Sequence, residues 1–295
     1  MDRPESNRME ATDQVYLCRM TEQVQALVGK EFRCLDKGFV RLIDVMGDDS
    51  AIVQAARVSY GSGTKQVHED RGLIRYLMRH LHTTPFEMVE FKFHVKLPIF
   101  VARQWIRHRT ANVNEYSGRY SEMKDEFYLP DSDQVRAQSS MNKQGRADTA
   151  FDPAEAERIR SVMSSTQQHL YDEYQQLLST DLAREIARIN LPVSNYTEWY
   201  WKIDLHNLFH FLRLRIDPHA QYEIRVYGEA MAEIAKAAVP LAYEAFEDYI
   251  LHARRFSRAE LEIIRSTLTS LPTVDELQLK GLSAREAREF LDKLQ

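Results

Sequence analysis

The sequence predicts an α+β protein in which strands come first and a long run of helices follows. Val89–Leu97 alternates apolar and polar residues, which is the period-two pattern of a half-buried strand. Gly38–Met46 is rich in apolar and β-branched residues and is expected to form another strand. From Pro153 onward the chain is expected to be almost wholly helical. This segregation favours α+β over an alternating parallel fold.

Helices are also expected around the two strands. Asp48, Asp49 and Ser50 offer N-caps for one of them, and Pro98 is suited to the first turn of another. The early helices are expected at residues 21–28, 48–57, 67–80 and 99–107. The later helices are expected at residues 153–179, 181–190, 197–214 and 219–253.

The chain is expected to consist of one main domain with additions at both ends. Residues 1–30 form a polar leader, 31–253 the main domain and 254–295 a charged helical appendage. Residues 131–152 are polar and poor in apolar side chains, so we expect an exposed insertion there.

Composition narrows the class of protein. Hydrophobic residues make up 44% of the chain, enough to build a core, and the net charge of −5 argues against a general nucleic-acid binder. Cys18 and Cys34 lack the spacing of a metal site, and a disulfide framework is not expected. With no signal peptide and no apolar run long enough to span a membrane, we expect a cytoplasmic protein.

The segment QWIRHRTANVNEYSGRYS, residues 104–121, carries most of the functional information. It gathers Arg107, His108, Arg109 and Arg119 around a glycine turn and contains no lysine. Arginine suits planar, bidentate contact with phosphate or carboxylate. A helix C-cap could explain Arg107 alone, but it does not explain the other basic residues. The segment therefore predicts an anion site.

The Ser117-Gly118-Arg119 turn has two interpretations. Glycine lets backbone amides face an anion, and the serine hydroxyl and Arg119 would complete a phosphate cradle. A serine nucleophile is the other interpretation, but the Gly-x-Ser-x-Gly context is absent and no strand directly precedes Ser117. Phosphate binding is favoured.

Other polar residues lie outside this segment. His206 and His210 are four apart on an expected helix and could bind zinc or simply pack against aromatic residues. Arg213 and Arg215 are two apart, so only one of them should reach a shared site. Arg184 and Arg188 could simply form a solvated basic pair. The polar cluster of His82, Thr84 and Glu87 could be a helix cap.

At this point the residues resemble the flavin-dependent thymidylate synthases. The signature of that family, Arg-His-Arg followed by seven residues and a serine, is matched by 107–109 and Ser117. The resemblance extends from about Leu35 to Phe246. It includes the segments DKGFVRLIDVMG, AARVSYG, HTTPFE, FHVKLPIFVARQW, SGRYSE, AREIARINLP and LRIDPHAQYEI.

The resemblance implies a fold and an activity. The fold is a mixed or antiparallel sheet packed with long helices, in a homotetramer whose active sites are shared between subunits. The reaction is methylation of dUMP to dTMP, with methylenetetrahydrofolate as carbon donor and NADPH-reduced FAD as hydride source. No metal, nucleic acid or membrane is implied, and no cysteine nucleophile is needed.

The resemblance also implies roles for individual residues. Arg215 would stabilise the anion formed when uracil loses its imide proton. The residues implied for dUMP are Gln104, Trp105, Ile106, Arg107, Glu115, Tyr116, Ser117, Gly118, Arg119, Arg188 and Arg215. The residues implied for FAD are Ser59, His82, Thr84, Arg107, His108, Arg109, Glu115, Asp204, Leu205, His206 and His210.

Two rival functions come from the residues themselves. A nucleotide- or RNA-binding module would use the arginine loop with Tyr116 and Tyr120 as stacking platforms. A metal-dependent hydrolase would be built on His206 and His210.

Overall fold

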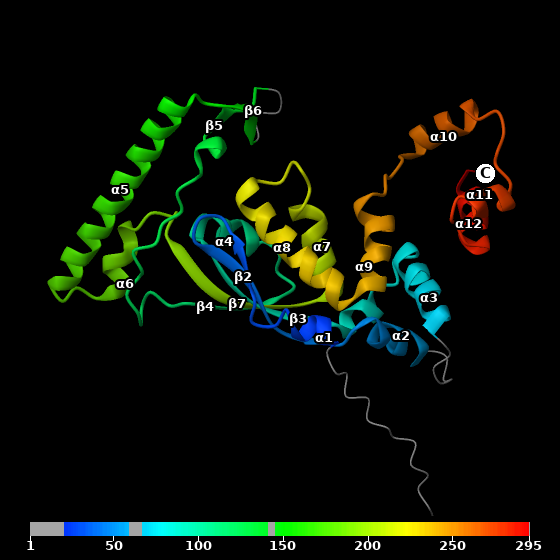
Figure 1. Ribbon diagram of the computed structural model, residues 1–295, viewed down its shortest axis with the longest axis horizontal. Helices are drawn as coiled ribbons and strands as arrows, with labels where there is room; N and C mark the ends of the chain where they lie inside the picture. Colours follow the sequence, from blue (N-terminus) through cyan, green and yellow to red (C-terminus); the bar gives the residue numbers. More distant parts are fainter. Residues whose placement is uncertain (1–20, 59–66, 141–144, 295) are drawn as a thin grey trace, which may run out of the picture. The chain divides into compact units, whose positions relative to one another are not determined.

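The computed structural model describes residues 21–58, 67–140 and 145–294 (Figure 1). The chain divides into two compact units, the first ending at Leu251 and the second spanning His252–Gln295. Within the described residues, no helix is both long and apolar enough to cross a membrane.

The first unit is built on a five-stranded sheet in the order β1-β2-β3-β7-β4. Every neighbouring pair is antiparallel. The strands are β1 (Glu31–Cys34), β2 (Gly38–Met46), β3 (Glu90–Pro98), β4 (Asn112–Glu115) and β7 (Tyr196–Asp204). The predicted α+β class with an antiparallel sheet is confirmed, although β1 and β4 were not expected.

The central strand β3 follows the predicted alternation. Phe91, Phe93 and Val95 are fully buried, whereas the side chains between them face the opposite side of the sheet. Phe93 pairs with Leu42 of β2 on one side and with Trp201 of β7 on the other. Apolar side chains from three strands therefore share one face.

The expected helix over 197–214 is wrong in its first half. Tyr196–Asp204 is strand β7, and helix α7 occupies only Leu205–Arg215. Trp199, Trp201 and Ile203 are buried, and the residues between them are more exposed, which is a period of two. Large aromatic side chains fit a pleated surface, so the helical interpretation missed a strand signal.

Two other long helices are interrupted. Residues 181–190 hold only α6 (Arg184–Ala187) and a 3-10 turn. The stretch 219–253 divides into α8 (Tyr222–Ala238), α9 (Pro240–Phe246) and a π-helical turn, because proline lacks an N–H and clashes with the preceding turn. The remaining helices of this unit are α1 (Glu22–Gln25), α2 (Asp49–Val58), α3 (Val67–Arg79), α4 (Ile99–Trp105) and α5 (Pro153–Ser179). The 3-10 turns are η1 (Thr84–Met88), η2 (Ser132–Gln134) and η3 (Arg188–Asn190), and the π turn is η4 (Glu247–Leu251).

Helices α4, α7 and α8 pack on the apolar face of the sheet (Figure 1). Trp105, at the end of α4, lies in the centre of this core. Its ring is 5.6 Å from Trp199, 5.2 Å from Trp201 and 4.7 Å from Phe211 of α7. These contacts fix the point at which the chain leaves α4.

The expected exposed insertion has more structure than the sequence indicated. It contains η2 and a hairpin of β5 (Arg136–Gln138) and β6 (Arg146–Ala150). Arg146 forms an ion pair with Glu223 of α8, whose side chain is 2% exposed. The Tyr128 hydroxyl also donates to Glu223, at 2.9 Å. The hairpin is therefore tied to the core.

The second unit is helical, as its sequence indicated. It comprises α10 (Arg258–Thr267), α11 (Val274–Leu279) and α12 (Ala284–Leu294). Only Leu277 and Ala287 are buried apolar side chains among its described residues. Of the leader, residues 1–20 lie outside the described part, and α1 packs against α8.

Candidate active site

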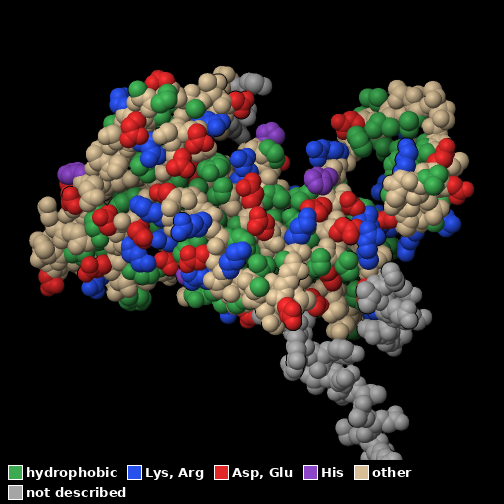
Figure 2. All heavy atoms as spheres, viewed as in Figure 1, with side chains coloured by type: hydrophobic (Ala, Val, Ile, Leu, Met, Phe, Trp, Pro, Cys, Tyr) green, Lys and Arg blue, Asp and Glu red, His purple; other side chains and the backbone are tan. Residues whose placement is uncertain are grey.

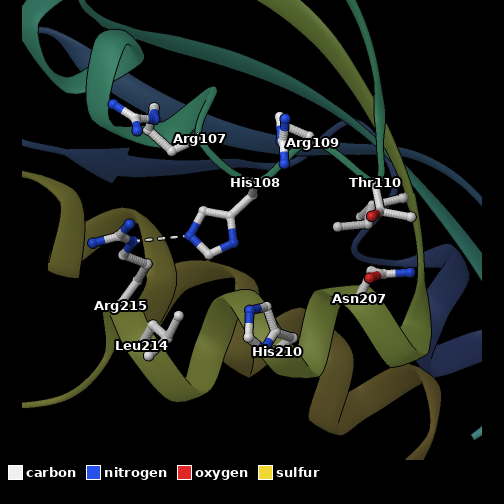
Figure 3. Close-up of a pocket in the computed structure, with 9 residues that line it drawn as sticks. Arg107, His108, Arg109, Thr110, Asn207, His210, Leu214 and Arg215 are labelled. Carbon is white, nitrogen blue, oxygen red and sulfur yellow. Dashed lines mark hydrogen bonds between the residues drawn. The ribbon is translucent and has the colours of Figure 1, made fainter.

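Helix α7 presents one wall of the site. Asp204 caps its first turn by accepting a hydrogen bond from the Asn207 backbone N–H at 2.9 Å. Asn207, His210 and Leu214 then recur at spacings of three and four residues, which places them on one helical face. Arg215 closes the same face at the C-terminal end (Figure 3).

The opposite wall is the Arg107–Thr110 loop that follows α4. The backbone N–H of His108 donates to the Trp105 carbonyl at 3.0 Å, so the loop begins on a residue anchored in the core. His108 points from this loop toward α7, and its ring lies 4.9 Å from that of Phe211 (Figure 3).

Between the two walls lies a cavity of about 400 Å³. It is lined by Arg107, His108, Arg109, Thr110, Ile203, Asn207, His210, Leu214 and Arg215. The lining holds three arginines and no carboxylate. At neutral pH its field favours an anionic ligand.

One hydrogen bond joins the walls. Arg215 Nε donates to His108 Nε2 at 3.1 Å (Figure 3). A guanidinium has only donors, so Nε2 must be the unprotonated nitrogen of a neutral imidazole. Burial first, and then the nearby Arg215 and His210, lower the pKa of His108 from 6.5 to about 4. His108 is therefore an uncharged acceptor at neutral pH.

Burial also lowers the pKa values of two other basic side chains in the pocket, His210 and Arg215. The pKa of His210 is lowered by burial first, and then by Arg213, His206 and Arg215. Burial also lowers the pKa of Arg215, but a guanidinium remains charged in proteins. The pocket thus holds fixed positive charge from arginine and two neutral imidazoles.

The Ser117-Gly118-Arg119 turn assembles elsewhere, against α6 and η3. A Cβ on Gly118 would lie 2.8 Å from Sδ of Met123 and 3.1 Å from both Cδ and an Nη of Arg188, so a side chain here would displace these neighbours. Arg119 Nε pairs with Glu185 of α6 at 2.8 Å. Ser117 Oγ accepts from the Arg119 backbone N–H at 3.3 Å. Arg188, which the resemblance also implies for dUMP, therefore lies beside this turn.

Within one chain, the Ser117-Gly118-Arg119 turn lies at a distance from the pocket between α7 and the Arg107–Thr110 loop. The Tyr116 backbone N–H donates to the Glu198 carbonyl on β7, whereas Ile203 of the same strand lines the pocket. Five residues of extended strand span about 16 Å at roughly 3.3 Å per residue. The cavity lining includes none of Ser117, Gly118, Arg119 or Arg188.

Several expected contact residues have other surroundings. Trp105 and Leu205 are fully buried in the core, so their side chains cannot reach a ligand in this chain and only their backbone could. Gln104 carries a buried side-chain oxygen with no hydrogen-bond partner among the described atoms. Ile106 is 44% exposed, and Glu115 accepts a hydrogen bond from the Thr197 hydroxyl at 2.8 Å.

The expected flavin residues lie partly around α7. His82 is exposed, with its ring 5.7 Å from Tyr76. Thr84 is exposed at the start of η1, which packs against α7. His206 is half-buried one turn before His210. Ser59 lies outside the described residues.

Four lining residues were missed by sequence reasoning: Thr110, Ile203, Asn207 and Leu214. Asn207 and Leu214 could have been found from their spacing to His210 on one helical face. Thr110 directly follows the Arg-His-Arg motif. Ile203 could not be found while β7 was interpreted as a helix.

The rival functions gain no support from the site. No cluster of three or more His, Cys, Asp or Glu side chains that could hold a metal occurs in the described part of the chain. Figure 2 shows one face of the molecule, where Lys and Arg side chains lie among Asp and Glu side chains. Nucleic-acid binders usually present a basic patch or stripe instead. With three arginines and no carboxylate, the lining of the pocket suits an anionic small molecule.

Comparisons with known proteins identify the family. The family described as "Thymidylate synthase complementing protein" matches residues 41–241. The flavin-dependent thymidylate synthase of Ruegeria pomeroyi is 58% identical over 262 residues, covering 88% of this chain and 86% of that protein. Its counterpart in Wolbachia pipientis wMel is 59% identical over 249 residues, covering 84% of this chain and 87% of that protein.

A solved structure is also similar. The UMP/dUMP methylase PolB from Streptomyces cacaoi, bound with 5-Br dUMP, is 34% identical with a TM-score of 0.68. The match covers 75% of this chain and 99% of that chain. The chain belongs to the flavin-dependent thymidylate synthase family, as its motifs implied.

Proposed function

We propose that this chain methylates dUMP to dTMP and that the pocket between α7 and the Arg107–Thr110 loop is where the chemistry takes place. The observation that carries the proposal is the Arg215–His108 hydrogen bond in an arginine-lined cavity. Methylenetetrahydrofolate donates the carbon, and FAD, reduced by NADPH, supplies the hydride chemistry when bound. Family membership supports the reaction.

The pocket's donors fit anionic ligands. Arg107 and Arg109 offer planar guanidiniums, and Asn207 offers an amide, in a lining without carboxylates. FAD, dUMP and the folate all carry negative charge, so they match this donor set. We assign Arg107, His108, Arg109 and His210 to the flavin side of the site.

Arg215 is the residue that activates the substrate. His108 engages its Nε, so both Nη groups remain to donate to a ligand. A half-buried positive charge stabilises the uracil ring after loss of its imide proton, and that anion is a better carbon nucleophile. Neutral His108 accepts the hydrogen bond that orients the Arg215 guanidinium, and it adds no second positive charge to the pocket.

A cysteine nucleophile has no part in this mechanism. Cys34 is buried on β1, and burial raises the pKa of its thiol to about 12. The thiolate, which is the nucleophilic form, is therefore scarce at neutral pH. Cys18 lies outside the described residues.

We further propose a homotetramer whose active sites are shared between subunits. The separation of the phosphate turn from the pocket supports this arrangement. Glu198, which anchors the turn, and Ile203, which lines the pocket, are separated by about 16 Å of strand at roughly 3.3 Å per residue. This distance exceeds the span from a pyrimidine ring to its 5′-phosphate. The turn of one chain would then hold the phosphate of a nucleotide whose ring lies in another chain's pocket. A cytoplasmic location remains a prediction.

The direct test follows the flavin absorbance of the purified protein. We expect FAD to bind, its spectrum to bleach with NADPH, and reoxidation to require dUMP together with methylenetetrahydrofolate while dTMP forms. Omitting dUMP is the matched control and should leave dTMP absent. Protein that binds no flavin, or that binds oligonucleotides or stoichiometric zinc instead, would refute the proposal.

A further inference from the structure

Helix α8 passes against the C-terminal turn of α7 at Gly228. This glycine is buried, and a Cβ built on it would lie 3.0 Å from Cγ2 of Ile216. The same Cβ would lie 3.4 Å from both the carbonyl carbon and the Cβ of Arg215. The backbone that carries Arg215 therefore rests directly on a position without a side chain.

Of the two helices, α8 is the less able to move. The Tyr227 hydroxyl, beside Gly228, donates to the Lys96 carbonyl on β3 at 2.9 Å. Glu223, at the start of α8, is held by Tyr128 and Arg146. Met231, one turn further on, is fully buried. These contacts fix α8 to the sheet and to the hairpin.

The turn of α7 is freer. Leu214 is 41% exposed, and Ile216 is only half-buried. Residues 217–219, which follow, are exposed. A side chain added at Gly228 would consequently be accommodated by lifting the α7 turn by a few tenths of an ångström. The Arg215–His108 hydrogen bond, now 3.1 Å, would lengthen toward the limit for such bonds.

We propose that Gly228 is a positioning residue for Arg215. Because it has no side chain, the C-terminal turn of α7 packs close to α8, and this distance aligns Arg215 Nε with His108 Nε2. This inference rests on the proposed role of Arg215. It adds a residue on a neighbouring helix that contacts neither ligand in the proposed site.

The test compares Gly228→Ala with Gly72→Ala in the full-length protein. Both glycines lie inside helices, where alanine favours the fold, but a Cβ on Gly72 meets nothing within 4 Å. We expect Gly228→Ala to stay folded and to lower kcat for dTMP formation about tenfold, because small displacements at a reacting centre are costly. KM for dUMP should change less than about threefold, since Arg215 acts mainly on the developing anion. Gly72→Ala should match the wild type.

An NMR titration of His108 reports the position of Arg215 relative to the His108 ring and does not require turnover. Burial, and after it Arg215 and His210, hold the pKa of His108 down, so a displaced Arg215 should let that pKa rise part of the way from about 4 toward 6.5. We expect this upward shift in the NMR titration of the His108 ring in Gly228→Ala and not in Gly72→Ala.

A second substitution makes the steric claim specific. Ile216→Leu removes the Cγ2 methyl that the new Cβ would meet first, so Gly228→Ala combined with Ile216→Leu should recover both kcat and the His108 titration. A normal titration in Gly228→Ala, an unrescued double variant, or an unfolded Gly228→Ala chain would each overturn the inference. If the wild type forms no dTMP, the proposed function fails, and the titration still decides the positioning of Arg215.

Discussion

At the residue scale, the pocket depends on two basic groups joined by a hydrogen bond. Arg215 keeps its charge and His108 gives up its own, because burial and the neighbouring guanidinium disfavour a second cation. The result is a fixed positive charge with a defined orientation. Catalysis that relies on charge developing in the substrate needs such a group in place before reaction.

Arg215→Ala tests this assignment. We expect a folded protein that retains flavin but loses dTMP formation by about 100-fold or more, the usual cost of removing one stabilising donor. The measurement is single-turnover dTMP formation with flavin content determined in parallel. Arg213→Ala, two residues away and outside the cavity lining, is the matched control and should retain most activity. Equal turnover in the two variants would remove Arg215 from its role.

His108 should leave a signature in the pH dependence of stability. Its pKa is about 4 in the folded protein and 6.5 ordinarily, so between these values only the unfolded chain binds the proton. The contribution of His108 to the free energy of unfolding is therefore fully present above pH 6.5 and is lost as the pH drops toward 4. We expect urea denaturation midpoints of the wild type to fall more steeply over this range than those of His108→Gln. Parallel curves would contradict the lowered pKa.

At the element scale, the decisive feature is β7. It pairs with β3 on one side and with β4 on the other, and it runs directly into α7. One strand thereby positions the pocket helix at its C-terminal end and the phosphate turn at its other end. The alternation in β3 was readable because polar and apolar residues strictly alternate. In β7, by contrast, tryptophan and tyrosine occupy both faces, and the period is less clear.

The hairpin of the insertion contributes to stability through Arg146. In Arg146→Ala the nearly inaccessible Glu223 carboxylate would lose its cationic partner, at a cost of about 3 kcal/mol. Chemical denaturation measures this loss. Arg136 is the control, since among the described residues its guanidinium donates to the Asp133 and Asp148 carbonyls, both within the hairpin region. Arg136→Ala should cost about 1 kcal/mol. Similar losses in both variants would show that the hairpin is not anchored by the ion pair.

At the scale of the whole molecule, the turn and the pocket that we propose to form the nucleotide site lie apart in one chain. Co-expression of Arg215→Ala and Arg119→Ala chains tests whether subunits complete one another. In the proposed homotetramer, mixed assemblies would contain some sites with an intact pocket from one chain and an intact turn from the other. We therefore expect the mixture to form dTMP faster than either variant alone. No recovery in mixed tetramers isolated with two affinity tags would argue against shared sites.

The sequence by itself determined the family and the α+β class, and it predicted a location for the chemistry, because all three depend on short-range patterns. Arg107, His108 and Arg109 are adjacent, β3 alternates strictly, and Arg215 lies near the end of the expected helix that carries His210. Only the tertiary structure decided which arginine bonds His108, that Trp105 lies in the core, and that Gly228 supports the Arg215 turn. The first two outcomes depend on packing between segments about a hundred residues apart, and the third depends on how two successive helices pack. No local periodicity encodes which side chains will meet across such contacts.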